Sequence, residues 1–153
     1  MFAVLGSLCA SAQKLTLHEP QTKSNVIYLA EPVTIQAGTP ADVGLAFRVA
    51  DGLHINSHSP FATEMIPTTL MVEPLPQVRI GRMQYPAGVK YAFDFAPQEK
   101  LSVYTGDFVV TMHVTAMRAG TYSLNGLLDY QACDNLQCYP VKTLPITVIL
   151  TAK

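Results

Sequence analysis

Four segments of this chain alternate apolar and polar residues with a period of two, the pattern of a strand with one buried face. They are DVGLAFRVA (42–50), DFVVTMHVTA (107–116), TYSLNGLLDY (121–130) and TLPITVIL (143–150). The residues predicted to face the core are Val43, Leu45, Phe47, Val49, Phe108, Val110, Met112, Val114, Ala116, Tyr122, Leu124, Leu128, Tyr130, Leu144, Ile146, Val148 and Leu150. No segment shows a long helical period free of proline or glycine. We therefore predict a fold built from half-buried β-strands.

Six shorter segments carry a weaker strand pattern. They are NVIYLA (25–30), PVTIQA (32–37), LHIN (53–56), TTLMVE (68–73), QVRIGRM (77–83) and LSVY (101–104). Turn residues separate these segments, and the 11 prolines suit strand edges and turns better than helix interiors. Short strands with a turn signal about every ten residues are typical of an antiparallel sandwich, so we predict an all-β protein of this class.

The segment PAGVKYAFDFAPQEK (86–100) contains three closely spaced aromatic residues, Tyr91, Phe93 and Phe95. Its alternation fits a strand followed by a turn. A long loop with an aromatic tip fits it equally well.

The length of 153 residues suits one domain, because a chain of this size can bury about two-thirds of its unfolded surface around one core. The formal net charge is −1 and only 14% of the residues are charged, which argues against nucleic acid or an anionic membrane surface as a partner. We expect protein or small-molecule partners.

The opening MFAVLGSLCASAQ is an apolar run that ends in Ala10-Ser11-Ala12, a small-residue pattern like that of a signal-peptidase site. We interpret residues 1–12 as the remnant of a secretion signal and 13–153 as a single domain. A first buried strand is the alternative. Cys9 lies within this run and is set aside. No other apolar run approaches the roughly 20 residues that span a bilayer, so we expect a soluble, exported mature chain.

The stretch YQACDNLQCYP (130–140) places Cys133 and Cys138 in a short connection between two predicted strands. Two close thiols in an exported protein can form a disulfide. Such a bridge closes a loop of about six residues and constrains the unfolded chain by only ~2 kcal/mol. That small gain favours a redox function slightly over a structural bridge, and the residues alone leave both open.

Metal binding and hydrolytic catalysis are weaker interpretations of these residues. Zinc needs three or four N or S ligands, and His54 and His58 lack the spacing of a zinc module. Met71, Met112 and Met117 fall at predicted strand positions, where core packing is the expected role of a methionine, so they do not indicate a copper site. No nucleophile elbow accompanies the serines near His58. We expect no metal and no cofactor.

The thiols themselves lack the usual activating features. No helix N-terminus is predicted near them, and Asp134 beside Cys133 disfavours a thiolate. We therefore expect slow exchange until a docked partner aligns its sulfur or supplies a thiolate.

The order of the motifs DGLHINSHSP, YPAGVKYAFDF, YTGDFVVTMHV and GLLDYQACDNLQCYP, followed by TLPITV, resembles the N-terminal periplasmic domain of the thiol:disulfide interchange protein DsbD. The resemblance covers roughly residues 25–152. It implies an immunoglobulin-like sandwich in the periplasm. It also implies a cysteine pair that takes electrons from a membrane-embedded reductase and passes them to disulfide isomerases and to thioredoxins of cytochrome c biogenesis.

The resemblance also implies roles for individual residues. Cys138 would form the mixed disulfide with a partner and Cys133 would resolve it, with Tyr130 and Tyr139 flanking the pair. The segment with Phe93, Asp94 and Phe95 would be a cap loop, in which Phe95 shields the disulfide and Asp94 is an acidic neighbour. An aromatic cover of this kind would restrict the disulfide to partners able to displace it.

Three features depart from the family pattern. Val141 replaces a second proline after the second cysteine, and Asp94 is all that remains of an acidic cluster in the cap. The sequence up to Lys153 holds neither a membrane-spanning region nor a thioredoxin module, so we expect the electron donor to be another chain.

Overall fold

The computed structural model describes residues 24–153, which form twelve β-strands and no helix. The strands are β1 (Val26–Leu29), β2 (Val33–Ile35), β3 (Ala41–Val49), β4 (His54–Asn56), β5 (Thr69–Val72), β6 (Val78–Gln84), β7 (Val89–Phe93), β8 (Ala96–Tyr104), β9 (Asp107–Ala116), β10 (Gly120–Tyr130), β11 (Ala132–Cys133) and β12 (Lys142–Ala152). The predicted signal remnant at residues 1–12, Cys9 and the first part of the predicted domain 13–153 lie outside the described residues.

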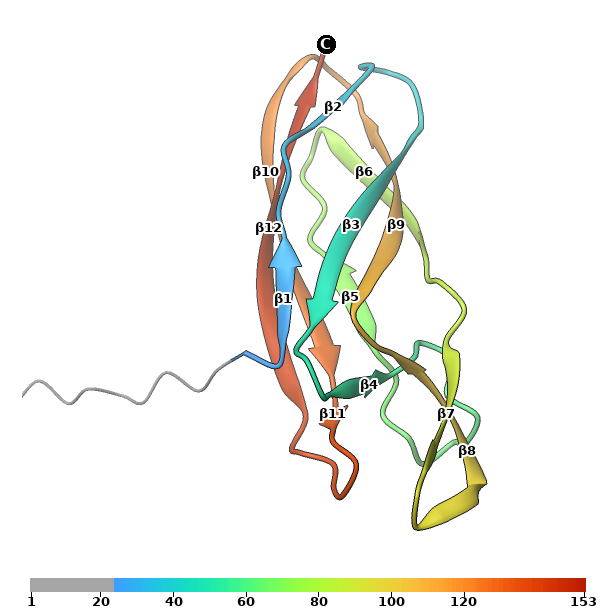
Figure 1. Cartoon of the computed structure of the whole chain (residues 1–153). Helices are drawn as coiled ribbons and strands as arrows, with labels where there is room; N and C mark the ends of the chain where they lie inside the picture. The colour runs from blue at the N-terminus through green and yellow to red at the C-terminus, as the bar shows by residue number, and fades with distance from the viewer. Residues whose placement is uncertain (1–23) are drawn as a thin grey trace, which may run out of the picture.

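Two four-stranded sheets face each other along the length of the molecule (Figure 1). One has the strand order β1-β3-β9-β6 and the other β2-β12-β10-β5. A third sheet, β11-β4-β8-β7, lies at the end of the sandwich opposite the C-terminus (Figure 1). The all-β sandwich predicted from the sequence is confirmed.

The core lies between the two facing sheets, where the predicted apolar faces meet. Phe47 of β3 stacks on Phe108 of β9 with ring centroids 5.3 Å apart. Leu124 of β10 and Val148 of β12 are fully buried partners in the opposite sheet. All four strong strand predictions are confirmed, although Tyr122 and Leu144 near the strand ends are only half-buried.

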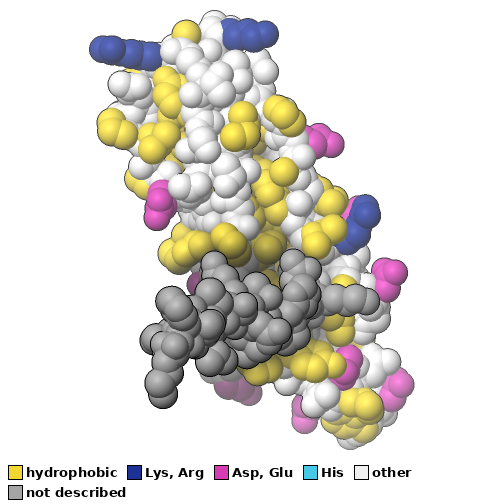
Figure 2. Space-filling view, turned by 90° about the vertical axis from the view of Figure 1, so that its left-hand side faces the viewer, with side chains coloured by type: hydrophobic (Ala, Val, Ile, Leu, Met, Phe, Trp, Pro, Cys, Tyr) yellow, Lys and Arg dark blue, Asp and Glu magenta, His cyan; other side chains and the backbone are white. Residues whose placement is uncertain are grey.

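The outer surface carries few charges. Figure 2 shows hydrophobic side chains spread among uncharged polar ones on the face that lies at the left in Figure 1. Isolated exposed apolar residues of this kind are normal on a sandwich whose inner faces are already covered. Residues 24–153 contain no helix that is long and apolar enough to cross a membrane.

The structure departs from the sequence prediction at two places. The pair β2–β12 is parallel, because the chain leaves β1 in one sheet and crosses to the other sheet at β2 before entering β3. The segment that the family resemblance made a cap loop is a β-hairpin. Its strands β7 and β8 are antiparallel, and Phe93 pairs with Ala96 across a tip formed by Asp94 and Phe95. The loop expectation was wrong, and the strand-and-turn alternative is correct.

Gly126 interrupts the apolar face of β10 for a packing reason. A Cβ at this position would lie 2.9 Å from the backbone oxygen of Met71 on β5 and 3.1 Å from Ile146 on β12. The backbone oxygen belongs to a paired strand and cannot rotate away. A glycine therefore fits at this position, where β10 lies between β5 and β12.

We expect Gly126→Ala to destabilise the protein by about 1–3 kcal/mol, because the added methyl overpacks the core. Denaturant unfolding measures this change. Gly44→Ala is the matched control: its Cβ would lie 3.2 Å from Val109, a half-exposed side chain that can move, so its effect should stay within about 0.5 kcal/mol. Equal stabilities for the two variants would contradict the packing argument.

Candidate redox site

Cys133 and Cys138 form a disulfide in the hairpin that joins β11 to β12, with an S–S distance of 1.96 Å. The two residues face each other as an antiparallel bridge. On one side, the Tyr139 N–H donates to the Ala132 carbonyl at 2.8 Å; on the other, the Asp134 N–H donates to the Gln137 carbonyl at 2.9 Å. The disulfide therefore joins a non-hydrogen-bonded pair, the position where facing side chains come closest.

The register between the two arms shifts by one residue next to the disulfide, in a stretch that contains Pro140. Tyr130 pairs with Lys142. Tyr130 lies three residues before Cys133, whereas Lys142 lies four residues after Cys138, so the β12 side carries one extra residue. Proline has no N–H to donate to the ladder and is tolerated at such an irregularity. The Gln131 side-chain amide donates to the Tyr139 carbonyl at 3.2 Å in this region.

The Asp134 carboxylate holds the four-residue turn between the cysteines. Its Oδ1 accepts backbone N–H bonds from Leu136 at 2.7 Å and Gln137 at 2.8 Å, and its Oδ2 accepts the Tyr139 hydroxyl. The Tyr139 bond, followed by the two backbone bonds, lowers the pKa of Asp134, and the same bond raises the pKa of Tyr139. Asp134 therefore stays ionised, and both of its carboxylate oxygens accept hydrogen bonds from residues of the same hairpin.

The two cysteines differ in accessibility. Cys133 is 1% exposed on the short strand β11, whereas Cys138 is exposed on the outer arm of the hairpin. Leu136 at the turn is 81% exposed and leaves this arm open to another molecule. A partner sulfur can therefore reach Cys138 more readily than Cys133.

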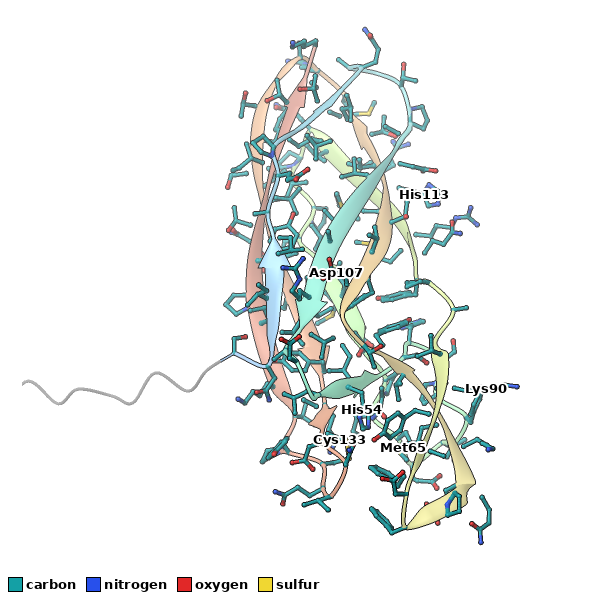
Figure 3. The ribbon with its side chains drawn as sticks, viewed as in Figure 1. His54, Met65, Lys90, Asp107, His113 and Cys133 are labelled. Atoms are coloured by element: carbon teal, nitrogen blue, oxygen red, sulfur yellow. A yellow bond between two sulfur atoms is a disulfide. The ribbon has the colours of Figure 1, made fainter. Side chains whose placement is uncertain are left out.

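The β7–β8 hairpin packs against His54, the residue that pairs with Cys133. In the third sheet, His54 of β4 pairs directly with Cys133 of β11 (Figure 3). The His54 ring lies 4.1 Å from the Tyr91 ring and 5.8 Å from the Phe93 ring, centroid to centroid. The Tyr91 hydroxyl donates to Asn135 in the cysteine turn, so the two hairpins are bonded to each other.

The residues predicted as shield lie at different depths on this hairpin. Phe93 is half-buried against His54, and Phe95 stacks on Phe93 with centroids 5.0 Å apart. Phe95 itself is 67% exposed at the tip, and Asp94 beside it is also exposed. Phe95 therefore lies one ring further from His54 than Phe93 does.

The two predicted flanking tyrosines have different environments. Tyr130 is buried in the core at 2% exposure, whereas Tyr139 is half-buried and bonded to Asp134. Only Tyr139 of this pair belongs to the polar network of the turn.

His54 and Tyr91 are site residues that the sequence analysis did not select. The LHIN pattern placed His54 on a strand, but its register against Cys133 depends on pairing between segments about 80 residues apart. In residues 24–153, no group of three or more His, Cys, Asp or Glu side chains is arranged to hold a metal ion.

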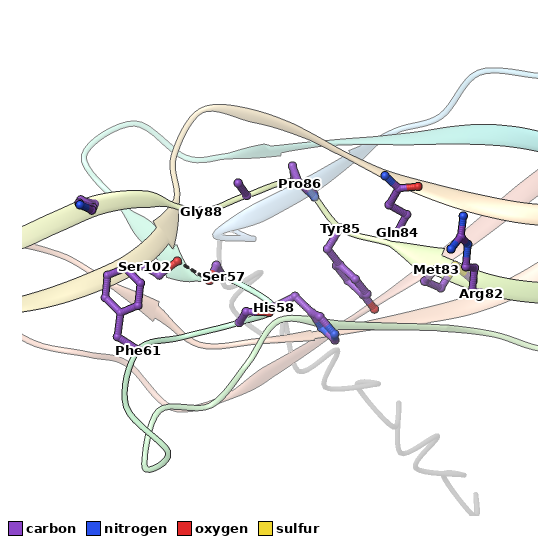
Figure 4. Close-up of a pocket in the computed structure, with 13 residues that line it drawn as sticks. Ser57, His58, Phe61, Arg82, Met83, Gln84, Tyr85, Pro86, Gly88 and Ser102 are labelled. Atoms are coloured by element: carbon purple, nitrogen blue, oxygen red, sulfur yellow. Dashed lines mark hydrogen bonds between the residues drawn. The ribbon is translucent and has the colours of Figure 1, made fainter.

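An open pocket of about 650 Å³ lies on the opposite face of the third sheet (Figure 4). Lys90 of β7 and Ser102 of β8 line this pocket and pair with each other. Their neighbours Tyr91 and Leu101 form the next pair, and successive residues of a strand point to opposite faces. Lys90 and Ser102 therefore point away from the face that carries Tyr91. His58 stacks on Tyr85 in this pocket with ring centroids 3.6 Å apart. The pocket is therefore separate from the disulfide.

The fold and the site define an immunoglobulin-like β-sandwich domain with a partly exposed disulfide in a hairpin at one end. The chain belongs to the family described as "Thiol:disulfide interchange protein DsbD, N-terminal", whose sequence profile matches residues 27–149. No curated protein sequence matches it significantly.

Three solved structures are similar to the chain. The N-terminal periplasmic domain of ScsB from Proteus mirabilis has a TM-score of 0.52 at 13% identity, over 80% of this chain and 44% of that one, and supports the fold. The reduced DsbD N-terminal domain of Neisseria meningitidis has a TM-score of 0.44 at 19% identity, over 69% and 74% of the two chains. The same domain in complex with the PilB N-terminal domain has a TM-score of 0.46 at 19% identity, over 69% and 73%.

We expect the reduced protein to be alkylated at Cys138 on the order of tenfold faster than at Cys133, because only Cys138 is exposed. Iodoacetamide labelling followed by peptide mass spectrometry measures both rates. In denaturant the two rates should converge. Equal rates in the folded protein would contradict the difference in burial.

Proposed function

We propose that this domain is a periplasmic thiol–disulfide oxidoreductase of the protein-disulfide reductase type. It relays electrons from a membrane reductase on another chain to the disulfides of periplasmic thioredoxin-like proteins or disulfide isomerases. The observation that carries the proposal is the Cys133–Cys138 disulfide, in which Cys133 is buried and Cys138 is exposed, at the end of a DsbD-family sandwich. The apolar opening that ends in Ala10-Ser11-Ala12 supports export.

The exchange proceeds through one mixed disulfide. The thiolate of reduced Cys138 attacks a partner disulfide, and the first partner sulfur leaves as a thiolate. Cys133 then attacks the Cys138 sulfur, the bond to the partner breaks, and its electron pair leaves with the partner sulfur. The partner gains two electrons and two protons, and the Cys133–Cys138 bond is restored.

The structural features of the hairpin support reversible use of the disulfide. Its loop is short, with a sequence separation of 5, so reduction should cost the fold only ~2 kcal/mol. The hydrogen bonds on both sides of the bridge and the Asp134 turn do not involve sulfur. The hairpin can therefore keep its form in both redox states.

A covalent trap tests the exchange. The reduced Cys133→Ala variant, incubated with an oxidised periplasmic thioredoxin-like protein, should accumulate a mixed disulfide through Cys138, because the resolving thiol is missing. Non-reducing electrophoresis and peptide mass spectrometry detect the adduct. Cys138→Ala is the control and should give far less adduct, since Cys133 is buried. Absence of a Cys138 adduct would contradict the relay.

A secreted immunoglobulin-like binding module with a purely structural bridge is the alternative function. It predicts a reduction potential below about −300 mV, whereas a relay disulfide should equilibrate in the higher range of the thiol oxidoreductases. Titration in glutathione or dithiothreitol buffers, read by alkylation and mass, separates these two functions.

The aromatic cover should slow small reagents. We expect Phe93→Ala to speed reduction of the disulfide by dithiothreitol by roughly three- to tenfold, and Phe95→Ala to have a smaller effect, since Phe95 lies one ring further out. Stopped-flow or quench kinetics measure these rates. Phe61→Ala, which removes an exposed ring from the separate pocket, is the control. Unchanged rates in both hairpin variants would remove these aromatics from the site.

A further inference from the structure

His54 is a buried histidine with an unused ring nitrogen. The residue is 2% exposed, and within residues 24–153 its Nε2 has no hydrogen-bond partner. Leaving a buried polar atom unpaired destabilises the fold, so each such atom in a native structure calls for a physical reason. The environment of His54 supplies one.

The position of His54 ties it to the buried cysteine. His54 and Cys133 are directly opposed residues of the antiparallel pair β4–β11, so their side chains lie on the same face of the sheet. Tyr91 and Phe93 from β7 cover the His54 ring on that face. The imidazole is thus enclosed between an aromatic hairpin and the strand that carries the resolving sulfur (Figure 3).

The titratable groups that face His54 come from three elements. Cys133 belongs to β11, Asp134 to the turn that follows it, and Tyr91 to β7. Strand β8, the other neighbour of β4, places the apolar Val103 on this face opposite Asn56. Burial lowers the pKa of His54, and the Asp134 carboxylate opposes this shift. Near pH 7 the ring is therefore neutral, and in its Nδ1–H tautomer Nε2 can accept a proton.

The resolving step requires such an acceptor. Cys133 must lose its proton to attack the mixed disulfide, but burial in apolar surroundings raises the pKa of a thiol. In the oxidised state Cys133 carries no proton and has no hydrogen bond to donate to Nε2. Reduction adds a proton to Cys133, the residue directly opposite His54 in the β4–β11 pair.

We propose that His54 accepts the proton of Cys133 during resolution of the mixed disulfide, an inference that rests on the proposed function. The Cys133 S–H bond breaks and its proton moves to Nε2. The sulfur attacks Cys138, the new S–S bond forms, and the partner sulfur leaves with the electron pair of the broken bond. The imidazolium then returns its proton to the leaving thiolate or to water, and His54 is neutral again.

The test uses the reduced full chain and 5,5′-dithiobis(2-nitrobenzoate). Cys138 releases one equivalent of the coloured thiolate as it forms the mixed disulfide, and Cys133 releases a second equivalent when it resolves it. His54→Phe keeps an aromatic ring against Tyr91 but removes the proton acceptor. We expect the second phase at pH 7 to slow on the order of tenfold or more, with the first phase unchanged within about twofold.

The pH profile separates proton transfer from packing. In the unmodified protein the second phase should level off above the pKa of His54. In His54→Phe it should keep rising by about tenfold per pH unit from pH 6 to 8, following the Cys133 thiolate. A uniform slowing with an unchanged profile, or no slowing at all, would overturn the role of His54. His113→Asn, which alters a histidine paired with Asp42 on β3, is the control and should leave both phases unchanged.

Two further outcomes keep the inference and the proposed function distinct. Release of only one equivalent by the unmodified protein would contradict resolution by Cys133 and hence the proposed exchange itself. Should His54→Phe fail to fold, the ¹⁵N resonance of His54 Nε2 in the unmodified protein decides the matter. We expect it to change between the oxidised and reduced states, and identical resonances and titration curves would refute the contact with the Cys133 thiol.

Discussion

The long pairing of β10 with β12 is the interaction on which the site depends. The two strands pair continuously from Gly120–Ala152 to Tyr130–Lys142 and bury their inner faces against the opposite sheet. Because this ladder fixes the chain on both sides of the cysteine turn, Cys133 and Cys138 are brought together by the sandwich rather than by their own bond. The one-residue shift at Pro140 then sets which side chains face each other in the hairpin. A disulfide held in this way can open without loss of its surroundings.

The third sheet divides the disulfide into a buried half and an accessible half. β11 follows β10 and pairs with β4, which places Cys133 opposite His54. The His54 ring in turn packs against Tyr91 and Phe93 of β7. Cys138 lies on the free arm, next to an exposed turn. Burial makes one thiol difficult to ionise and hard to reach, while exposure makes the other available to a second protein. The proposed division into attacking and resolving cysteines therefore has a basis in the position of each residue in the fold.

Side-chain periodicity predicted most of the fold because it reports burial directly. The faces of β3 and β9 could be named residue by residue, and their pairing confirms them. Periodicity could not separate a strand from a loop at Tyr91–Phe95, because a hairpin that projects from the sandwich is only partly buried along its length. It also gave no reason to connect His54 with Cys133. Their contact comes from pairing between distant segments, and a lone histidine on a short strand has no local pattern that indicates its neighbour.

The amino-acid sequence alone determined that this chain forms strands, where β3, β9, β10 and β12 lie, and that two cysteines occupy a tight connection between adjacent strands. These properties follow from local spacing, since alternation and turn residues act over a few positions. Tertiary structure alone decided which cysteine is buried and that the aromatic segment is a hairpin bonded to the cysteine turn through Tyr91 and Asn135. It also decided that His54, which has an unpaired ring nitrogen, pairs with Cys133. Those properties depend on strand register and on which surfaces pack together, and both are set by the whole chain at once.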